Sequence, residues 1–144
     1  MPNALGTRTT LPTFAPYPFI LQQDWEALDN FMIKYARNYQ EAWFGCRLGG
    51  QEPGSYHQDY LMDTMWRQLK QYRPDIILVA KDHVLIAEVT TAAGPRALGQ
   101  AILYLILYNK QPLFKQPPRA GIICIYADED IRYAAQQLKI EIYD

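Results

Sequence analysis

The stretch RPDIILVAKDHVLIAEVTT, residues 73–91, decides the fold that we predict for this chain. It contains two apolar runs, residues 76–80 and 84–90, on either side of the polar tripeptide 81–83. Short apolar runs with many β-branched residues are typical of buried strands. A short polar connection suits a tight turn between antiparallel strands. The sequence therefore predicts a β-hairpin over residues 75–90.

Helices and further strands are predicted on both sides of this hairpin. Gly94-Pro95 marks a helix start, because proline is favoured at the first helical position, and Asp128 is placed to cap another helix. In chain order the predicted elements are helices over residues 24–44 and 58–71, then, after the hairpin, a helix over 94–109, a strand over 120–127, a helix over 128–138 and a strand over 139–143. They predict an α/β fold in which helices, two of them N-terminal, flank a mixed central sheet.

The first of these helices is predicted from a single apolar stripe. Asp24 precedes the stripe and is a suitable N-cap residue. Apolar side chains then recur at steps of three and four, which is the spacing of one helix face: Trp25, Leu28, Met32, Tyr35, Tyr39 and Trp43.

Residues 1–20 are predicted to form an extended arm ahead of a single domain over residues 21–144. Four prolines oppose helix formation in this segment. The arm nevertheless carries large apolar side chains that favour burial, namely Leu11, Phe14, Tyr17, Phe19 and Ile20. We therefore expect the arm to pack on its own domain, on a second subunit of a homo-oligomer or on another protein partner.

Composition indicates an intracellular globular protein. The chain has 144 residues, 49% of them hydrophobic and 20% charged, as is usual for one folded domain. No signal peptide and no apolar run of transmembrane length is visible, and Cys46 and Cys124 lack the spacing of a zinc site. We expect no membrane partner and a cytoplasmic location, with a virion or host-cell location left open.

The net charge of −1 argues against tight, non-specific binding of nucleic acid over the whole surface. Lys110, Lys115 and Arg119 follow one predicted helix. They are interpreted either as a local basic patch or as a solvated loop.

Two carboxylates in the hairpin are the candidates for chemistry. Alternation along residues 84–90 puts Ile86, Glu88 and Thr90 on one face of the strand. A carboxylate among apolar residues is costly to bury unless it is paired or bound to a metal, and the hairpin brings Asp75 toward Glu88. Converging carboxylates suit Mg²⁺ or Mn²⁺. The alternative is that Asp75 caps a turn while Glu88 pairs with an arginine, Arg73 or Arg96.

These residues resemble the PD-(D/E)XK nuclease superfamily, including its RecB-like and Holliday-junction-resolvase-like members. The resemblance rests on Pro74-Asp75, on Glu88-Val89-Thr90, and on Gln100 and Tyr104 of the following helix, which look like the QxxxY pattern. It covers about half of the chain, from residue 73 to residue 144. It implies a restriction-endonuclease-like core, DNA as the partner, and magnesium or manganese bound by Asp75 and Glu88.

The sequence departs from this pattern at Thr90, where the family has a lysine. A threonine hydroxyl can hydrogen-bond a water but carries no positive charge. Arg96 is a candidate replacement, because Arg96, Gln100 and Tyr104 lie at steps of four on one helix face. The alternative for Arg96 is a surface or ion-pairing role, and the alternative for Gln100 and Tyr104 is an ordinary polar edge of a buried helix.

The resemblance implies two further metal ligands. One is the carbonyl of Val89, and the other is an acid of the first helix, for which Glu41 is the best match. An ion pair with Arg37, four residues earlier, is the alternative for Glu41. His57 and His83 are expected to be exposed rather than catalytic.

Two functions remain open at this point. The first is a metal-dependent nuclease that hydrolyses DNA phosphodiester bonds. The second is a catalytically weak or inactive nuclease-like fold that serves as a DNA-binding or assembly subunit, for example in a viral or multiprotein complex. The acidic pair favours the first function, and the missing lysine favours the second.

Overall fold

A computed structural model describes residues 5–49 and 72–144 of the chain. These residues form a six-stranded sheet in the order β1-β2-β3-β4-β5-β6. The strands are β1 (Thr7–Thr10), β2 (Glu41–Phe44), β3 (Ile76–Val79), β4 (Val84–Ala93), β5 (Pro118–Ala127) and β6 (Ile140–Tyr143). Strands β1 to β4 are antiparallel neighbours, whereas β4, β5 and β6 run parallel. The predicted α/β class and mixed sheet are therefore confirmed.

The predicted hairpin is present as β3 and β4. Its register pairs Ile76 with Ala87 and Val79 with Val84, and a bend at residues 81 and 82 joins the strands. The second strand is longer than predicted, because β4 continues to Ala93 while β3 covers only its first four residues. Among the described residues, no strand pairs with the far part of β4 on the β3 side, and this stretch is called the free edge of β4.

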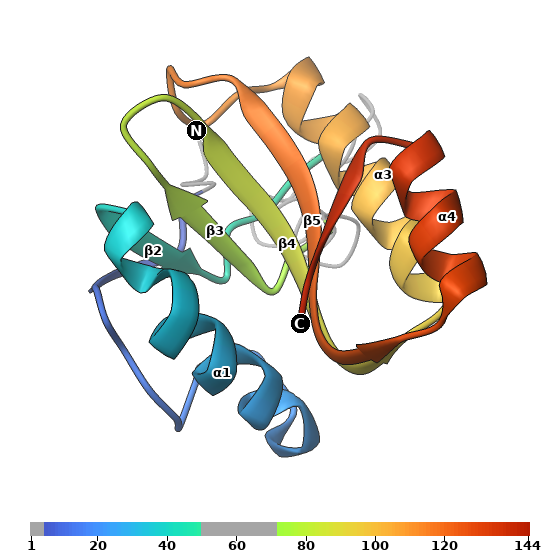
Figure 1. Ribbon diagram of the computed structural model, residues 1–144. Coiled ribbons are helices and arrows are strands. Elements are labelled where there is room, and N and C mark those ends of the chain that lie inside the picture. Colours follow the sequence, from blue (N-terminus) through green and yellow to red (C-terminus); the bar gives the residue numbers. More distant parts are fainter. Residues whose placement is uncertain (1–4, 50–71) are drawn as a thin grey trace, which may run out of the picture.

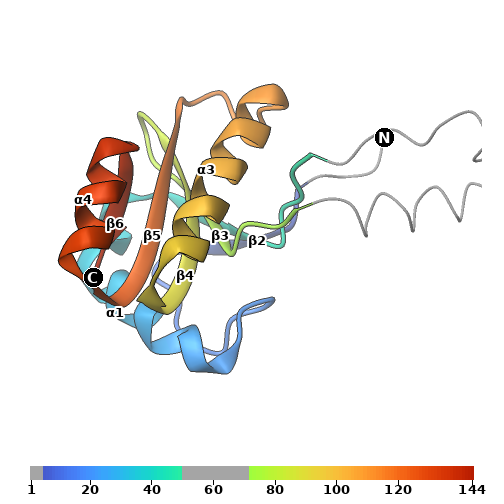
Figure 2. The same cartoon turned by 90° about the vertical axis from the view of Figure 1, so that its right-hand side faces the viewer.

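Two helices return the chain between the parallel strands, as parallel neighbours require. They are α3 (Pro95–Lys110) and α4 (Glu129–Gln137). Asp128 caps α4 as predicted, since its Oδ1 accepts a hydrogen bond from the Ile131 amide at 2.9 Å. Both helices cover the same face of the sheet (Figure 1), and α4 also packs on the edge strand β6 (Figure 2).

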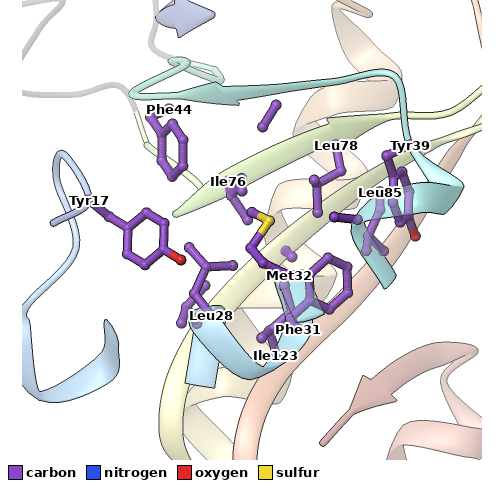
Figure 3. Packing of buried hydrophobic residues seen from close by; sticks show 14 of the residues in the cluster. Tyr17, Leu28, Phe31, Met32, Tyr39, Phe44, Ile76, Leu78, Leu85 and Ile123 are labelled. Carbon is purple, nitrogen blue, oxygen red and sulfur yellow. The ribbon is translucent and has the colours of Figure 1, made fainter. Parts of the chain in front are cut away.

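The opposite face of the sheet is covered by α1 (Trp25–Tyr35). Leu28, Phe31 and Met32 of this helix are at most 2% exposed and pack on inward-facing residues of β2 to β5 (Figure 3). Burying such side chains contributes roughly 1.5–3 kcal/mol each. The sheet is therefore the middle layer of three, and both of its faces are apolar.

The prediction of one helix over residues 24–44 is wrong from residue 36 onward. The α-helix ends at Tyr35, a 3-10 turn covers Ala36–Asn38, and Glu41–Phe44 form strand β2. Ala42 and Phe44 face α1, whereas Trp43 faces α3. Aromatic residues fit a half-buried strand well, and a spacing of four residues also keeps one strand face. The helix predicted over residues 58–71 lies outside the described residues.

The described part of the predicted arm, residues 5–20, packs on the domain. Thr7–Thr10 form the edge strand β1, which pairs with β2, because β-branched threonines suit a strand. Tyr17 and Ile20 are only 5% and 7% exposed and belong to the core under α1. The Tyr17 hydroxyl donates a hydrogen bond to Asp29 Oδ1 at 2.5 Å. Residues 5–20 thus pack on their own domain.

No helix in the described part of the chain combines the length and apolar composition that crossing a membrane requires. Cys46 and Cys124 are both buried free thiols, as predicted for Cys124.

Candidate functional site

Asp75 and Glu88 lie across from each other where β3 begins. Ile76 is paired with Ala87, so Asp75 and Glu88 form the next pair along the two strands. Ile77 and Ile86, each two residues further into the hairpin, face α3. Side chains two residues apart on a strand lie on the same face, so Asp75 and Glu88 also face α3. Glu88 is 9% exposed and is the one buried charged residue of the described chain.

The free edge of β4 is capped by carboxylates. Asp75 Oδ2 accepts a hydrogen bond from the Val89 amide at 2.8 Å. Two residues on, the Thr91 amide donates to Asp24 Oδ1 at 3.0 Å. Within the part of the chain that the structure describes, these amides have no ladder partner beyond the start of β3, and the carboxylates satisfy them instead. In an extended strand the Val89 carbonyl points to the same side as its amide.

Helix α3 contributes a polar row to the same place. The Tyr104 side chain is 5% exposed and its hydroxyl hydrogen-bonds the Glu88 carboxylate. Gln100 and Arg96 follow at steps of four toward the helix start, half-buried and exposed respectively. The structure thus brings Tyr104 and Glu88 together and sets Gln100 and Arg96 on the same helix face.

The two carboxyl groups resist ionisation. Burial, followed by the negative charge of Asp75, raises the pKa of Glu88 from 4.5 to about 8, against a smaller lowering by Tyr104 and the Arg96 charge. Burial also raises the pKa of Asp75 from 3.8 to about 6; the Val89 amide opposes this rise and the Asp24 charge adds to it. A hydrogen bond joins the two groups, raising the pKa of Glu88 and lowering that of Asp75.

We predict that the metal-free protein loses stability as the pH rises from about 5 to about 9. Both pKa values are higher in the folded chain than in the unfolded chain, so the folded state binds more protons over this interval. The stabilisation is complete below the unfolded pKa values and disappears as the pH passes the folded ones. Thermal unfolding in EDTA measures this slope. A melting temperature that rises over the same interval would contradict the raised pKa values.

The donor set fits a hard divalent cation. Two facing carboxylates whose charges repel, with a backbone carbonyl on the same edge, offer oxygen ligands alone. Magnesium is commonly held by one or two carboxylates and completes its shell with water and substrate oxygens. Within residues 5–49 and 72–144, no group of three or more His, Cys, Asp or Glu side chains is arranged to hold a metal ion. The candidate centre is therefore a carboxylate pair.

Thr90 follows on the Glu88 side of the strand. Its side chain is half-buried, and its hydroxyl lies 3.4 Å from the Ala92 carbonyl. Thr90 stands two residues after Glu88, where the nuclease pattern that the sequence resembles has a lysine. The hydroxyl adds a donor at this edge but no positive charge.

Arg96 influences Glu88 without touching it. Its charge lowers the pKa of Glu88, yet none of the ion pairs between described residues involves Glu88. The alternative of a direct Glu88–arginine pair therefore does not describe the site.

Glu41 does not belong to this site. It lies on β2 across from Val79, four residues along β3 from Asp75, or about 13 Å at the rise of a strand. Its Oε2 is 2.7 Å from Arg8 Nε, so the ion pair exists with Arg8 rather than with Arg37. The prediction placed Glu41 on a helix, and the strand that forms there carries it away from the hairpin.

The other sequence candidates also lie elsewhere. His83 is in the hairpin turn, at the opposite end of β4, and its Nδ1 is 2.8 Å from Asp82 Oδ1. Its side chain is only 12% exposed, so it is more buried than predicted, because it packs on Tyr39. His57 lies outside the described residues.

The exposed residues of the proposed basic patch lie toward the hairpin-turn end of the sheet. Lys110 ends α3, six residues after Tyr104, which is about 9 Å along the helix. Lys115 and Arg119 follow in the connection to β5 and at its start.

Asp24 is the site residue that sequence reasoning missed. It occupies the predicted N-cap position, but its side chain makes no capping bond to α1. It binds instead to Thr91, 67 residues away, and its charge acts on Asp75. Only the packing of α1 on β4 creates this contact, so no local sequence signal reveals it.

Comparison with known proteins adds no relative: no protein-family model matches the chain, and no curated protein or solved structure matches it. The function is therefore inferred from the geometry and chemistry of the site.

Proposed function

We propose that this protein is a metal-dependent nuclease whose divalent cation, Mg²⁺ or Mn²⁺, is held by Asp75 and Glu88 with the Val89 carbonyl. The observation that supports the proposal most strongly is the facing pair of carboxyl groups at the free edge of β4, of which Glu88 is buried and Asp75 half-buried, and whose pKa values are both raised. A purely structural pair would gain stability by replacing one acid with a neutral residue. A bound cation offsets the repulsion between the two ionised carboxylates, so both acids can be charged at the same time.

The fold we propose for the core is that of the restriction-endonuclease-like nucleases. The hairpin β3–β4, the crossover helix α3, the parallel strand β5, helix α4 and strand β6 have the order expected for that core. Fold resemblance alone does not establish activity, so the proposal depends on the site.

The surroundings of the carboxylates suit a phosphodiester. Arg96 is exposed in the first turn of α3 and supplies a positive charge. A phosphate of the substrate would thus meet positive potential beside a centre that is otherwise negative.

Each side chain has a separate task in this proposal. Asp75 and Glu88 hold the cation, which when bound lowers the pKa of a coordinated water and stabilises charge on the phosphate. Tyr104 orients Glu88 through its hydroxyl. Arg96 attracts the phosphate but cannot accept a proton at working pH. Thr90 offers a hydroxyl to a nearby water.

The test is cleavage of plasmid, linear and branched DNA with Mg²⁺ or Mn²⁺. We expect phosphodiester hydrolysis that depends on the cation and stops with EDTA. Failure to cleave any of these substrates with either cation would contradict the proposed activity and leave the second function, a nuclease-like fold that binds DNA or assembles with other proteins.

Thr90 is the specific observation that favours this second function, and it leads to a mutational prediction. Thr90→Lys should raise the cleavage rate at least about tenfold, because a positioned proton-transfer group contributes on the order of 10²–10⁴ in rate. The measurement is the initial rate on linear DNA. Thr10→Lys, which adds the same charge on the exposed strand β1, is the control and should leave the rate unchanged. An unchanged rate in a Thr90→Lys protein that melts like the wild type would contradict this role for position 90.

A further inference from the structure

An exposed aromatic ring, Phe19, lies near the carboxylates and has no part in the proposed hydrolysis. Its side chain is 62% exposed. Its backbone has a φ of 64°, in the left-handed region that bulky residues seldom adopt. Such strained residues persist only where the surrounding structure holds them, and they cluster at binding sites.

The segment around Phe19 is firmly anchored. Its neighbours Tyr17 and Ile20 are buried in the core under α1. The Ile20 carbonyl accepts a hydrogen bond from Trp25 Nε1 at 3.0 Å. The exposed ring is therefore displayed by an ordered turn.

Phe19 contacts a glycine and a cation. A Cβ on Gly45 would lie 2.5 Å from Phe19 Cε2, so the ring rests directly on that backbone, where φ is +75°. The guanidinium of Arg73 lies over the ring, 5.5 Å from its centroid, and Arg73 is itself exposed. The two side chains thus form a cation–π pair at the surface.

This pair adjoins the carboxylate site. Arg73 precedes Asp75 by two residues, so their backbones are at most about 7 Å apart. Gly45 directly follows β2, and the register of β2 with β3 carries it toward Asp75. Phe19, Arg73 and Asp75 therefore meet at one end of the sheet.

We propose that Phe19 and Arg73 form a platform for an unpaired base of single-stranded DNA, whose neighbouring phosphodiester enters the Asp75–Glu88 site. Aromatic rings and arginine stack on bases, while arginine also attracts the backbone. Paired bases hide their faces inside a duplex, so the platform selects single-stranded segments. A chain of net charge −1 has little general electrostatic attraction for DNA. Stacking on a base would therefore supply a larger share of the binding free energy. This inference rests on the proposed nuclease function and adds the form of its substrate.

The experiment is fluorescence anisotropy with a labelled oligothymidylate of about 12 nucleotides, within the range of single-strand site sizes, and a blunt duplex of equal length. Calcium replaces magnesium to prevent cleavage. Phe19→Ala should weaken single-strand binding about tenfold with little effect on the duplex, and Phe19→Tyr should restore it. Arg73→Ala should weaken it as well. Phe14→Ala removes another exposed ring of the arm, 48% exposed, and should change nothing.

Cleavage assays on the same oligonucleotides separate this inference from the proposed function. If the wild type cleaves DNA but Phe19→Ala binds and cleaves the single strand normally, the platform is refuted and the nuclease proposal stands. The same conclusion follows if Phe19→Ala lowers only the melting temperature, or weakens single-strand and duplex binding equally. If the wild type neither binds nor cleaves DNA, both proposals fail.

Discussion

Asp75→Asn should abolish cation-dependent DNA cleavage, lowering the rate by at least about 10³. A metal centre supplies several kcal/mol of transition-state stabilisation, and every 1.36 kcal/mol corresponds to a factor of ten. Asparagine keeps an oxygen that can accept the Val89 amide bond, so the change removes charge and leaves the local structure in place. The measurement is the single-turnover rate on linear DNA with Mg²⁺.

Asp82→Asn is the matched control for this prediction. Asp82 is an exposed aspartate in the hairpin turn, at the other end of β4, so its replacement should leave the rate unchanged. Cleavage that survives Asp75→Asn would mean that the activity comes from another site or from a contaminant.

Glu88→Gln should make the metal-free protein more stable at alkaline pH while removing cleavage. Above its folded pKa of about 8, Glu88 is charged although it is buried and faces Asp75. Glutamine has a similar shape and can still accept a hydrogen bond from Tyr104. We expect a gain of about 2 kcal/mol at pH near 9, or roughly 5 °C in melting temperature for a domain of this size.

The pH dependence of this gain identifies its cause. The difference between Glu88→Gln and the wild type should shrink as the pH falls to about 4 and below, where Glu88 is protonated in both the folded and the unfolded chain. Mg²⁺ should raise the melting temperature of the wild type at pH 9 and have no effect on the variant. If Glu88 served instead as a structural partner of Arg96, Glu88→Gln would destabilise the protein at every pH above 5.

The elements that could be predicted from the sequence are those with an unambiguous local pattern of residues. The hairpin was predictable because two apolar runs flank a short turn, and the Asp128 cap of α4 was predictable from one side chain. Residues 36–44 were not, because aromatic residues at steps of four satisfy a helix face and a strand face equally. Strand pairing with β1 and β3 decides between them, and that pairing is invisible in the local sequence.

The site also combines residues that local patterns predict with residues that only tertiary contacts bring in. A short hairpin fixes its own register, so the approach of Asp75 to Glu88 could be inferred before any coordinates. Tyr104 was placed by helix periodicity and the resemblance to a nuclease pattern. Asp24 and Phe19 depend on how α1 and the arm pack against the sheet. Contacts of this kind join distant parts of the chain and require the tertiary structure.

Anomalous diffraction from crystals soaked in Mn²⁺ tests the central claim most directly. We predict one strong peak within bonding distance of the Asp75 and Glu88 carboxylates and the Val89 carbonyl, and no such peak in Asp75→Asn crystals prepared identically. If other carboxylates bind Mn²⁺ in these crystals but no anomalous peak lies between Asp75 and Glu88, the assignment of this pair as a cation site is contradicted.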